Sequence, residues 1–225
     1  MKQEEQATKL AQMMKKIGNL AQKETICVIT NMEEPLGKAV GNSLEVQEAI
    51  RALQGELEED VQEVVFTLGA YMLKLAGKGE DIEENKQKMY KQIQEGKAFE
   101  KCKEWIKRQG GDISYLEDFN KWKKANYIVP VIAENTGYIT KLDAQTVGVL
   151  AMELGAGRVK KEDSIDPLVG IVLEKKVGAK VEKGEALAYI HANSEEKAKK
   201  VQEDLANAYK IENKKVEKKN ILAII

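Results

Sequence analysis

The spacing of apolar residues divides the chain into a helical first part and a mixed second part. Over residues 1–17, apolar side chains recur every three or four positions, which predicts an amphipathic helix. Four further segments show the same periodicity, and a glycine suited to a C-terminal stop follows each of them. The aromatic stripe of the last segment, with Phe99 and Trp105, is typical of core packing. These helices are expected near residues 43–54, 58–76, 81–95 and 97–109.

One segment in this helical part has the character of a strand. Residues 25–30 are apolar at consecutive positions, which is typical of a strand inside a parallel sheet that is covered on both faces. A sheet needs partner strands, and the pattern up to residue 110 offers none. We therefore expect the chain to be a fragment of a longer protein. The open strand should be covered by the C-terminal part of the chain or pair with a second copy.

After Gly110-Gly111 the pattern changes from helical to strand-like. The segments expected to be strands are residues 127–133, 137–142, 168–173, 185–191 and 220–225, with helices over 144–154 and 194–209. Asp143 is a credible N-cap for the first of these helices. We predict two domains, an α/β domain over residues 1–118 and a small α+β domain over residues 119–225.

Composition excludes several classes of function. The 225 residues include 36 basic and 37 acidic side chains, so bulk electrostatics would recruit neither a nucleic acid nor a membrane. No segment has the length and apolarity of a membrane span or the features of a signal peptide, and we expect a cytoplasmic location. Cys27 and Cys102 form no C-x-x-C motif and are expected to be reduced. His191 is the single histidine, which excludes a histidine-based metal cluster; we expect a structural or solvent-facing role for it.

The loop after the strand is the most informative segment. A strand that ends in a loop before a helix is the place where open α/β sheets bind ligands. Residues 31–50 read NMEEPLGKAVGNSLEVQEAI. They resemble the D-M-x-x-P-L-G-x-A-x-G-N-A-L-E-V-x-E-A segment of pyrimidine-nucleoside and thymidine phosphorylases. Asn31 stands where that family often has aspartate, and the adjacent pair Glu33-Glu34, which replaces a polar pair, is interpreted as surface charge.

A second stretch resembles the same family. The G-x-x-V-x-x-G-x-x-L pattern from Gly178 to Leu187 is similar to the hammerhead hairpin of biotinyl and lipoyl carrier domains. A carrier needs an exposed lysine in an M-K-M or D-K-A tripeptide, and the sequence contains neither. Together with GAGR at 155–158, IDP at 165–167 and IHA at 190–192, the pattern resembles the C-terminal domain of the phosphorylases. The resemblance thus covers almost the whole chain.

The resemblance implies a fold and an activity. Residues 1–118 would be the C-terminal part of the family's central glycosyltransferase-like α/β domain, truncated here, and residues 119–225 its α+β domain with a hammerhead-like hairpin. Family members are cytoplasmic homodimers of nucleoside salvage that convert phosphate and a pyrimidine nucleoside into the free base and (deoxy)ribose 1-phosphate. Their phosphate loop, K-x-S-T-G-G, and pyrimidine motif, R-x-x-S-I-x-S-K, are absent from this sequence. No catalytic residue is therefore assigned, and the isolated chain is expected to be inactive.

The resemblance also implies a cation site. Family members bind potassium through main-chain carbonyls and a carboxylate of the loop–helix segment, and the matching positions are Leu36, Ala39 and Glu48. The chemistry is reasonable, because a hard cation prefers oxygen ligands and an irregular loop leaves carbonyls free. The alternative is that Glu48 is an ordinary exposed helix residue.

Two other functions stay open from the sequence. A scaffold or interaction module could share the phosphorylase C-terminal fold without belonging to an enzyme. An anthranilate-type phosphoribosyltransferase shares the larger fold but usually lacks this C-terminal domain. The sequence does not distinguish thymidine-selective from broad pyrimidine specificity.

Overall fold

The computed structural model describes residues 3–158 and 160–225. They form two compact units, each built from separated segments of the chain. The first, here called the helical unit, contains the residues up to Asn31, Leu57–Ala98 and Lys219–Ile225; the second, the sheet unit, contains Met32–Glu56 and Phe99–Lys218. Because each unit contains separated segments, the units differ from the two consecutive domains predicted from the sequence. The domain boundary at residue 118 stays a prediction.

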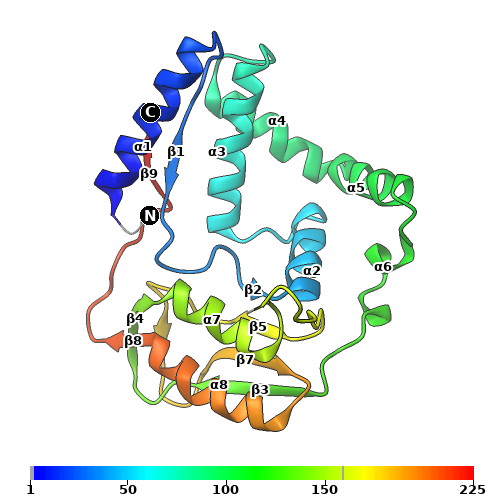
Figure 1. Cartoon of the computed structure of the whole chain (residues 1–225), viewed down its shortest axis with the longest axis vertical. Helices are drawn as coiled ribbons and strands as arrows, with labels where there is room; N and C mark the ends of the chain where they lie inside the picture. Colours follow the sequence, from blue (N-terminus) through cyan, green and yellow to red (C-terminus); the bar gives the residue numbers. More distant parts are fainter. Residues whose placement is uncertain (1–2, 159) are drawn as a thin grey trace. The chain divides into compact units, whose positions relative to one another are not determined.

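The helical unit combines helices with one pair of strands. Its elements are α1 (Glu4–Leu20), β1 (Val28–Thr30), α3 (Glu59–Leu75), α4 (Ile82–Gln94) and β9 (Ile221–Ile224). Asp81 caps α4 by accepting a hydrogen bond from the Glu84 N–H at 2.8 Å. The buried Asn85 amide of α4 donates to the carbonyls of Ala70 and Gly79 at 3.2 and 2.8 Å, which fixes α4 against the end of α3. α1, the strand pair and α3 lie side by side (Figure 1).

The strand predicted over residues 25–30 has a partner from the other end of the chain. β1 pairs antiparallel with β9, with Val28 opposite Ile224 and Ile29 opposite Ala223. The N–H groups of Cys27 and Ile225 donate to each other's carbonyls at 3.0 and 2.9 Å. Among the described residues this strand has an antiparallel partner, and the parallel neighbours expected for it stay a prediction. The expectation that the C-terminal part covers the strand is confirmed.

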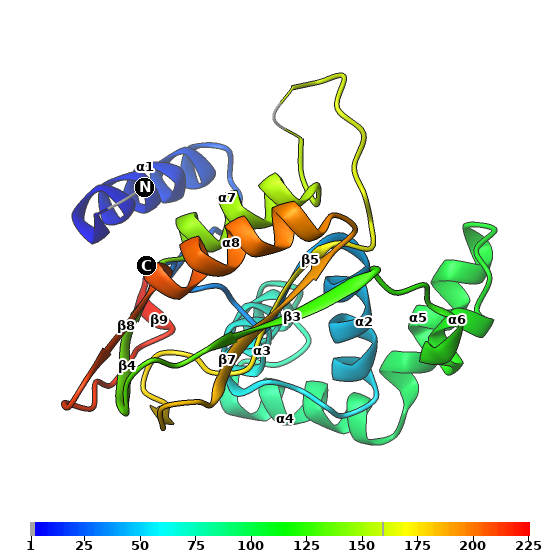
Figure 2. The same cartoon turned by 90° about the horizontal axis from the view of Figure 1, so that it is seen from below.

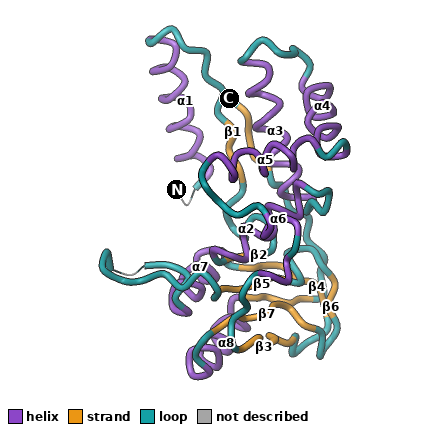
Figure 3. The backbone as a smooth tube through the Cα atoms, turned by 90° about the vertical axis from the view of Figure 1, so that its right-hand side faces the viewer, coloured by secondary structure: helices purple, strands orange, loops and turns teal. Residues whose placement is uncertain are grey.

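The sheet unit holds the principal core. Its strands form a four-stranded antiparallel sheet of order β2-β5-β7-β3 and a three-stranded antiparallel sheet of order β6-β4-β8 (Figure 3). The strands are β2 (Ala39–Val40), β3 (Tyr127–Ile132), β4 (Gly137–Leu142), β5 (Gly170–Leu173), β6 (Lys180–Val181), β7 (Ala186–Ala192) and β8 (Tyr209–Glu212). The helices are α2 (Asn42–Leu53), α5 (Lys97–Arg108, which begins at the end of the helical unit), α6 (Ser114–Glu117), a 3-10 turn η1 (Phe119–Lys121), α7 (Ala144–Leu154) and α8 (Glu195–Ala208).

Alternation along the strands determines which face of the larger sheet is buried. Ile171, Leu173 and Ile190 are fully buried beneath α7 and α8, which lie on one face of the sheet (Figure 2). α2 lies on the opposite face (Figure 2). The helices begin at polar caps, since Asp143 accepts from the Thr146 N–H at 2.7 Å and Ser194 accepts from the Lys197 N–H at 3.3 Å.

The backbone at Gly41, just after β2, approaches the backbone at Gly170, the first residue of β5. A Cβ added to Gly41 would lie 2.5 Å from the Val169 carbonyl oxygen, and one added to Gly170 would lie 2.3 Å from the Val40 oxygen. Both glycines also have positive φ, 148° and 155°. Only residues without a side chain allow this junction. It holds the start of α2 against the sheet.

The helices match the predicted ones closely, with two exceptions. α1 continues through Gly18 to Leu20, and the first two positions of the predicted helix lie outside the described residues. The core-packing prediction for residues 97–109 is wrong: no residue of α5 is buried, and Trp105 is 61% exposed. The short elements β2, α6, η1, β6 and β8 were not predicted.

Candidate cation site

The loop that carries the predicted cation ligands is held by a carboxylate of α2. Glu48 Oε1 accepts a hydrogen bond from the Lys38 N–H at 2.7 Å, and Oε2 accepts one from the Ala39 N–H at 3.2 Å. Gly37, with φ of 70°, makes this contact possible, because a Cβ there would lie 2.7 Å from Glu48 Oε2. Glu48 is half-buried against the segment that contains Leu36 and Ala39. It is not the free surface carboxylate of the alternative interpretation.

A lysine from a distant part of the chain binds the other side of the loop. Lys176 Nζ donates hydrogen bonds to the carbonyl oxygens of Pro35 and Gly37 at 2.7 and 2.8 Å. Its side chain is only 13% exposed. These two carbonyls flank that of Leu36. The Lys176 ammonium therefore occupies the carbonyl oxygens on either side of a predicted cation ligand. An irregular loop leaves such carbonyls without helical or sheet partners, and a buried carbonyl needs a donor.

Glu34 is not surface charge, which corrects the interpretation of the Glu33-Glu34 pair. Its side chain is 7% exposed and forms ion pairs with Lys218 and, at 3.9 Å, with Lys176. Glu34 Oε2 also accepts from the Val177 N–H at 2.9 Å. A buried carboxylate is costly unless it is paired and hydrogen-bonded, and here it has both kinds of partner. Glu33 is exposed as predicted, and its carbonyl accepts from the Ala144 N–H at 3.0 Å.

The negative charge of Glu34 affects a neighbouring phenol. The Tyr209 side chain donates hydrogen bonds to the Leu187 and Lys175 carbonyls at 3.1 and 3.3 Å. Burial raises the pKa of Tyr209 far above its usual value, and the charges of Glu34 and Glu174 raise it further. Tyr209 is therefore a neutral hydrogen-bond donor that connects the start of β8 to β7.

The remaining candidate groups do not assemble into a further centre. Among the described residues, no three His, Cys, Asp or Glu side chains are grouped closely enough to hold a metal ion. Cys27 and Cys102 are both free thiols. Within the same described ranges, no helix has the length and hydropathy needed to cross a membrane. His191 lies half-buried on β7, and its pKa is lowered by burial and by the charge of Lys124.

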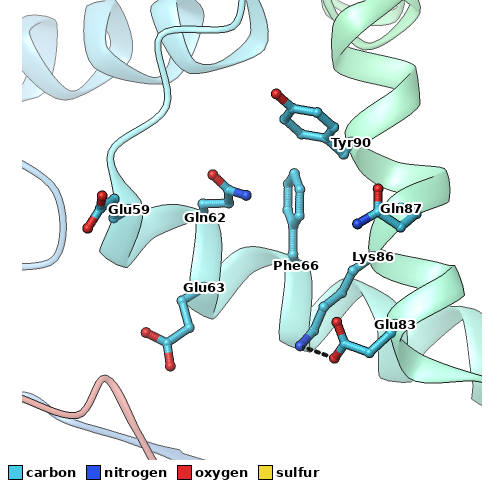
Figure 4. Close-up of a pocket in the computed structure, with 8 residues that line it drawn as sticks. All are labelled: Glu59, Gln62, Glu63, Phe66, Glu83, Lys86, Gln87 and Tyr90. Carbon is cyan, nitrogen blue, oxygen red and sulfur yellow. Dashed lines mark hydrogen bonds and ion pairs between the residues drawn. The ribbon is translucent and has the colours of Figure 1, made fainter.

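The helical unit contains a cavity of about 460 Å³ between α3 and α4 (Figure 4). Phe66 and Tyr90 meet there edge to face, with ring centroids 6.3 Å apart. Three of its charged groups are partnered within the unit: Lys86 pairs with Glu83 at 2.7 Å, and Glu63 accepts from the Asn220 amide at 2.6 Å. We interpret this cavity as the junction of two packed helices.

Comparison with known proteins matches both parts of the chain. Residues 1–99 match a family model described as "Glycosyl transferase family, a/b domain", and residues 138–212 match "Pyrimidine nucleoside phosphorylase C-terminal domain". A protein of Bacillus subtilis named "Pyrimidine-nucleoside phosphorylase" is 47% identical over 209 residues, 93% of this chain and 47% of that protein. The chain belongs to the pyrimidine-nucleoside phosphorylase family. A relative with the same name from Staphylococcus aureus is 45% identical over 196 residues, 87% of this chain and 45% of its own length. The chain spans about half the length of these curated relatives.

Family membership gives the loop geometry a context. Leu36, Ala39 and Glu48, the three positions predicted as cation ligands, lie in one loop–helix junction of the sheet unit. Both Glu48 oxygens are engaged by backbone N–H groups of that loop, and each keeps further acceptor capacity. The arrangement could hold a hard monovalent cation through the Leu36 and Ala39 carbonyls and one carboxylate.

The two buried charged residues that hold this loop, Lys176 and Glu34, were not predicted from the sequence. Lys176 stands in the Lys-rich, turn-rich segment before Gly178, where lysines are usually solvated, and Glu34 was one of two adjacent acids. Nothing in local patterning separates Glu34 from Glu33. The one available hint was that a Pro/Gly loop frees several carbonyls, which require donors from elsewhere in the fold.

Proposed function

We propose that the protein to which this chain belongs is a pyrimidine-nucleoside phosphorylase. In this reaction a phosphate oxygen bonds to the anomeric carbon of the nucleoside while the carbon–nitrogen bond breaks. The bonding electrons leave with the base, which takes up a proton, and (deoxy)ribose 1-phosphate remains. The observation that supports the proposal most is the match of a glycosyl transferase a/b model and a pyrimidine nucleoside phosphorylase C-terminal model in order along one chain, together with 47% identity to a relative named pyrimidine-nucleoside phosphorylase.

In this proposal the chain supplies scaffold and one cation site rather than the reacting groups. Phosphate binding and stabilisation of the departing base need cationic and hydrogen-bonding groups, which the family provides through two motifs that this sequence does not contain. Potassium binds to the Leu36 and Ala39 carbonyls and Glu48. Lys176 keeps the adjacent carbonyls of Pro35 and Gly37 occupied, so the loop presents few alternative ligands.

Several finer features belong to the same proposal. The protein acts as a cytoplasmic homodimer, with phosphate as co-substrate and neither nucleic acid nor membrane as partner. The segment from Gly178 to Leu187 is a hammerhead-like corner. Support for the corner comes from pairing, because β6 belongs to the three-stranded sheet and β7 to the four-stranded sheet, so the chain changes sheets there. Positive φ at Gly178 and Gly184 fits the two tight turns.

The experiment measures base release by the full-length protein that contains this chain. Uridine and thymidine are incubated with and without inorganic phosphate, and free uracil and thymine are separated and quantified. Phosphate-dependent release with formation of a pentose 1-phosphate is the expected result. A folded full-length protein that releases no base from either nucleoside would instead favour the scaffold function. Consumption of a phosphoribosyl diphosphate in place of phosphate would favour the phosphoribosyltransferase alternative.

The cation assignment is tested in the same full-length protein with Glu48→Ala. We expect the melting temperature of the unmodified protein to rise with potassium chloride relative to a salt of a larger cation. Glu48→Ala should lose most of this rise. Glu45→Ala is the matched control, because Glu45 is three residues away on α2 and accepts a hydrogen bond from the Gly41 N–H at 3.0 Å instead of from the loop of Leu36 and Ala39. An undiminished potassium response in Glu48→Ala contradicts the assignment.

A further inference from the structure

The sheet unit contains a second cavity, of about 410 Å³, on the face of the four-stranded sheet that α2 covers in part. Strand register defines its floor. Tyr189 lies opposite both Pro130 and Val172, and His191, two residues along β7, lies opposite Ile128. Ala188 and Ile190, their neighbours on β7, are fully buried in the core, so Tyr189 and His191 point to the other face of the sheet, because side chains alternate along a strand. The floor therefore combines the apolar side chains of Ile128 and Val172 with the polar groups of Tyr189 and His191.

Two walls rise from this floor. One is α2, whose Ser43, Gln47 and Arg51 recur every four residues and so share a face. The other is the segment from η1 to the start of β3, which contributes Phe119, Trp122 and two lysines. Trp122 is fixed in place, because its indole N–H donates to the Tyr115 carbonyl at 2.7 Å and its ring packs edge to face on Tyr115.

The cavity is positively charged. Arg51 approaches from the α2 wall, Lys123 and Lys124 from the other, and Glu174 is the acidic residue of the lining. The Arg51 guanidinium lies over the Phe119 ring, with its carbon 4.8 Å from the ring centroid. That contact holds the guanidinium in place while leaving donors for a ligand. Lys124 also acts on His191 in the floor of the cavity, because its positive charge adds to the effect of burial in lowering the pKa of that histidine.

We propose that this cavity binds a small molecule that joins a planar ring to an anionic phosphate, a ligand of the mononucleotide class. Its size suits such a molecule, since ligand cavities usually enclose about 300–1,000 Å³. Trp122, Phe119 and Tyr189 offer faces and edges for the ring, and Arg51 and Lys124 offer donors for the phosphate. The site is separate from the candidate cation loop and its occupation does not depend on the proposed phosphorolysis.

The single histidine gives a direct readout of binding. Uridine 5′-monophosphate is titrated into the 225-residue chain while the imidazole Cε1–H signal of His191 is followed by NMR. A saturable shift is expected, together with a rise of the His191 pKa, because a bound anion offsets the charge of Lys124. Uridine tests whether the ring alone suffices, and inorganic phosphate tests whether the anion alone suffices. Both should bind much more weakly than the nucleotide.

Substitutions locate the binding in this cavity. Arg51→Met and Lys124→Gln should each weaken binding of uridine 5′-monophosphate about five- to tenfold, the usual size of one partly exposed charge-assisted contact. Lys121→Gln is the matched control, because Lys121 is an exposed lysine of η1 that does not line the cavity. It should leave affinity unchanged. One-dimensional spectra verify that each variant is folded.

Three results would overturn the proposal. The first is no movement of the His191 signal at millimolar nucleotide. The second is equal binding of uridine or of inorganic phosphate, which would remove either the anionic or the aromatic requirement. The third is an equal loss of affinity in Lys121→Gln and Lys124→Gln, which would show a diffuse electrostatic effect instead of a site.

Discussion

Single residues decide how the loop before α2 is held, and two of them are charged and buried. Glu34 and Lys176 lie 3.9 Å apart and are both largely shielded from solvent. Lys176 donates to two main-chain carbonyls, and Glu34 accepts from the Val177 N–H and pairs with both Lys176 and Lys218. Such a network adds conformational specificity as much as stability, because removing one member leaves the others unsatisfied.

Lys176→Met should therefore destabilise the chain by about 2 kcal/mol or more, since two carbonyls lose their donor and Glu34 loses one cation. Urea denaturation of the 225-residue chain measures the change. Lys175→Met is the control: Lys175 is the preceding residue, and its more exposed ammonium pairs with Glu185 at 3.8 Å. That substitution should cost less than about 1 kcal/mol. Equal effects of the two variants would contradict the role of Lys176.

His191 makes stability depend on pH in a defined direction. Burial, then the charge of Lys124, holds its folded pKa below the usual value of about 6.5. Between the folded and unfolded pKa values the unfolded chain binds more protons, so this contribution is complete above pH 6.5 and is lost as the pH falls. His191→Gln should flatten the decline of unfolding free energy between about pH 7 and pH 5. An NMR titration of the folded chain should give a lowered pKa for His191, and a normal or raised pKa would contradict this assignment.

At the scale of elements, the β1–β9 pair is the feature that sequence reasoning could not place. The apolar run at residues 25–30 predicted a strand, and it did not reveal that the partner is at the far end of the chain and runs antiparallel. Pairing depends on long-range contacts that no local pattern records. The helices were placed well, because glycine stops and polar caps are local. β8 was missed since it follows α8 without a turn residue between them.

The pairing predicts an alternating pattern of hydrogen exchange. In an antiparallel pair, successive N–H groups point alternately toward and away from the partner. The Cys27 and Asn31 N–H groups donate to the carbonyls of the two residues that flank β9, at 3.0 and 2.8 Å, so these amides and that of Ile29 should exchange slowly. The Val28 amide should exchange faster. If β1 also pairs with a second copy of the chain, Val28 gains protection as protein concentration rises, and uniformly fast exchange at all four amides contradicts the strand pair.

The exposed face of α5 shows where the candidate core was overestimated. A stripe with Phe99 and Trp105 is the usual pattern of core packing, yet no residue of this helix is buried. Amphipathic periodicity identifies a helix and the face that would be buried; it does not say whether the described residues supply the covering surface. The cation loop was predicted for a similar local reason, from a contiguous motif, while its partners Glu34 and Lys176 required the fold.

At the scale of the whole molecule, the 225 residues by themselves should not release base from uridine or thymidine. The phosphate and pyrimidine motifs of the family are absent from this sequence. Loss of each charge-stabilising donor typically costs about 100- to 1,000-fold in rate. Base release is measured with the purified chain and, in parallel, with the full-length protein as positive control. Turnover by the purified chain at a rate near that of the full-length protein would disprove the prediction.

The division of the helical unit into three chain segments has a consequence for synthesis. Lys219–Ile225 completes this unit, whereas the sheet unit is already complete at Lys218. As the chain leaves the ribosome, β1 emerges long before β9, because the whole sheet unit and most of the helical unit are synthesised between them. During that interval its edge and the apolar side chains beside it are open to chaperones or to neighbouring nascent chains.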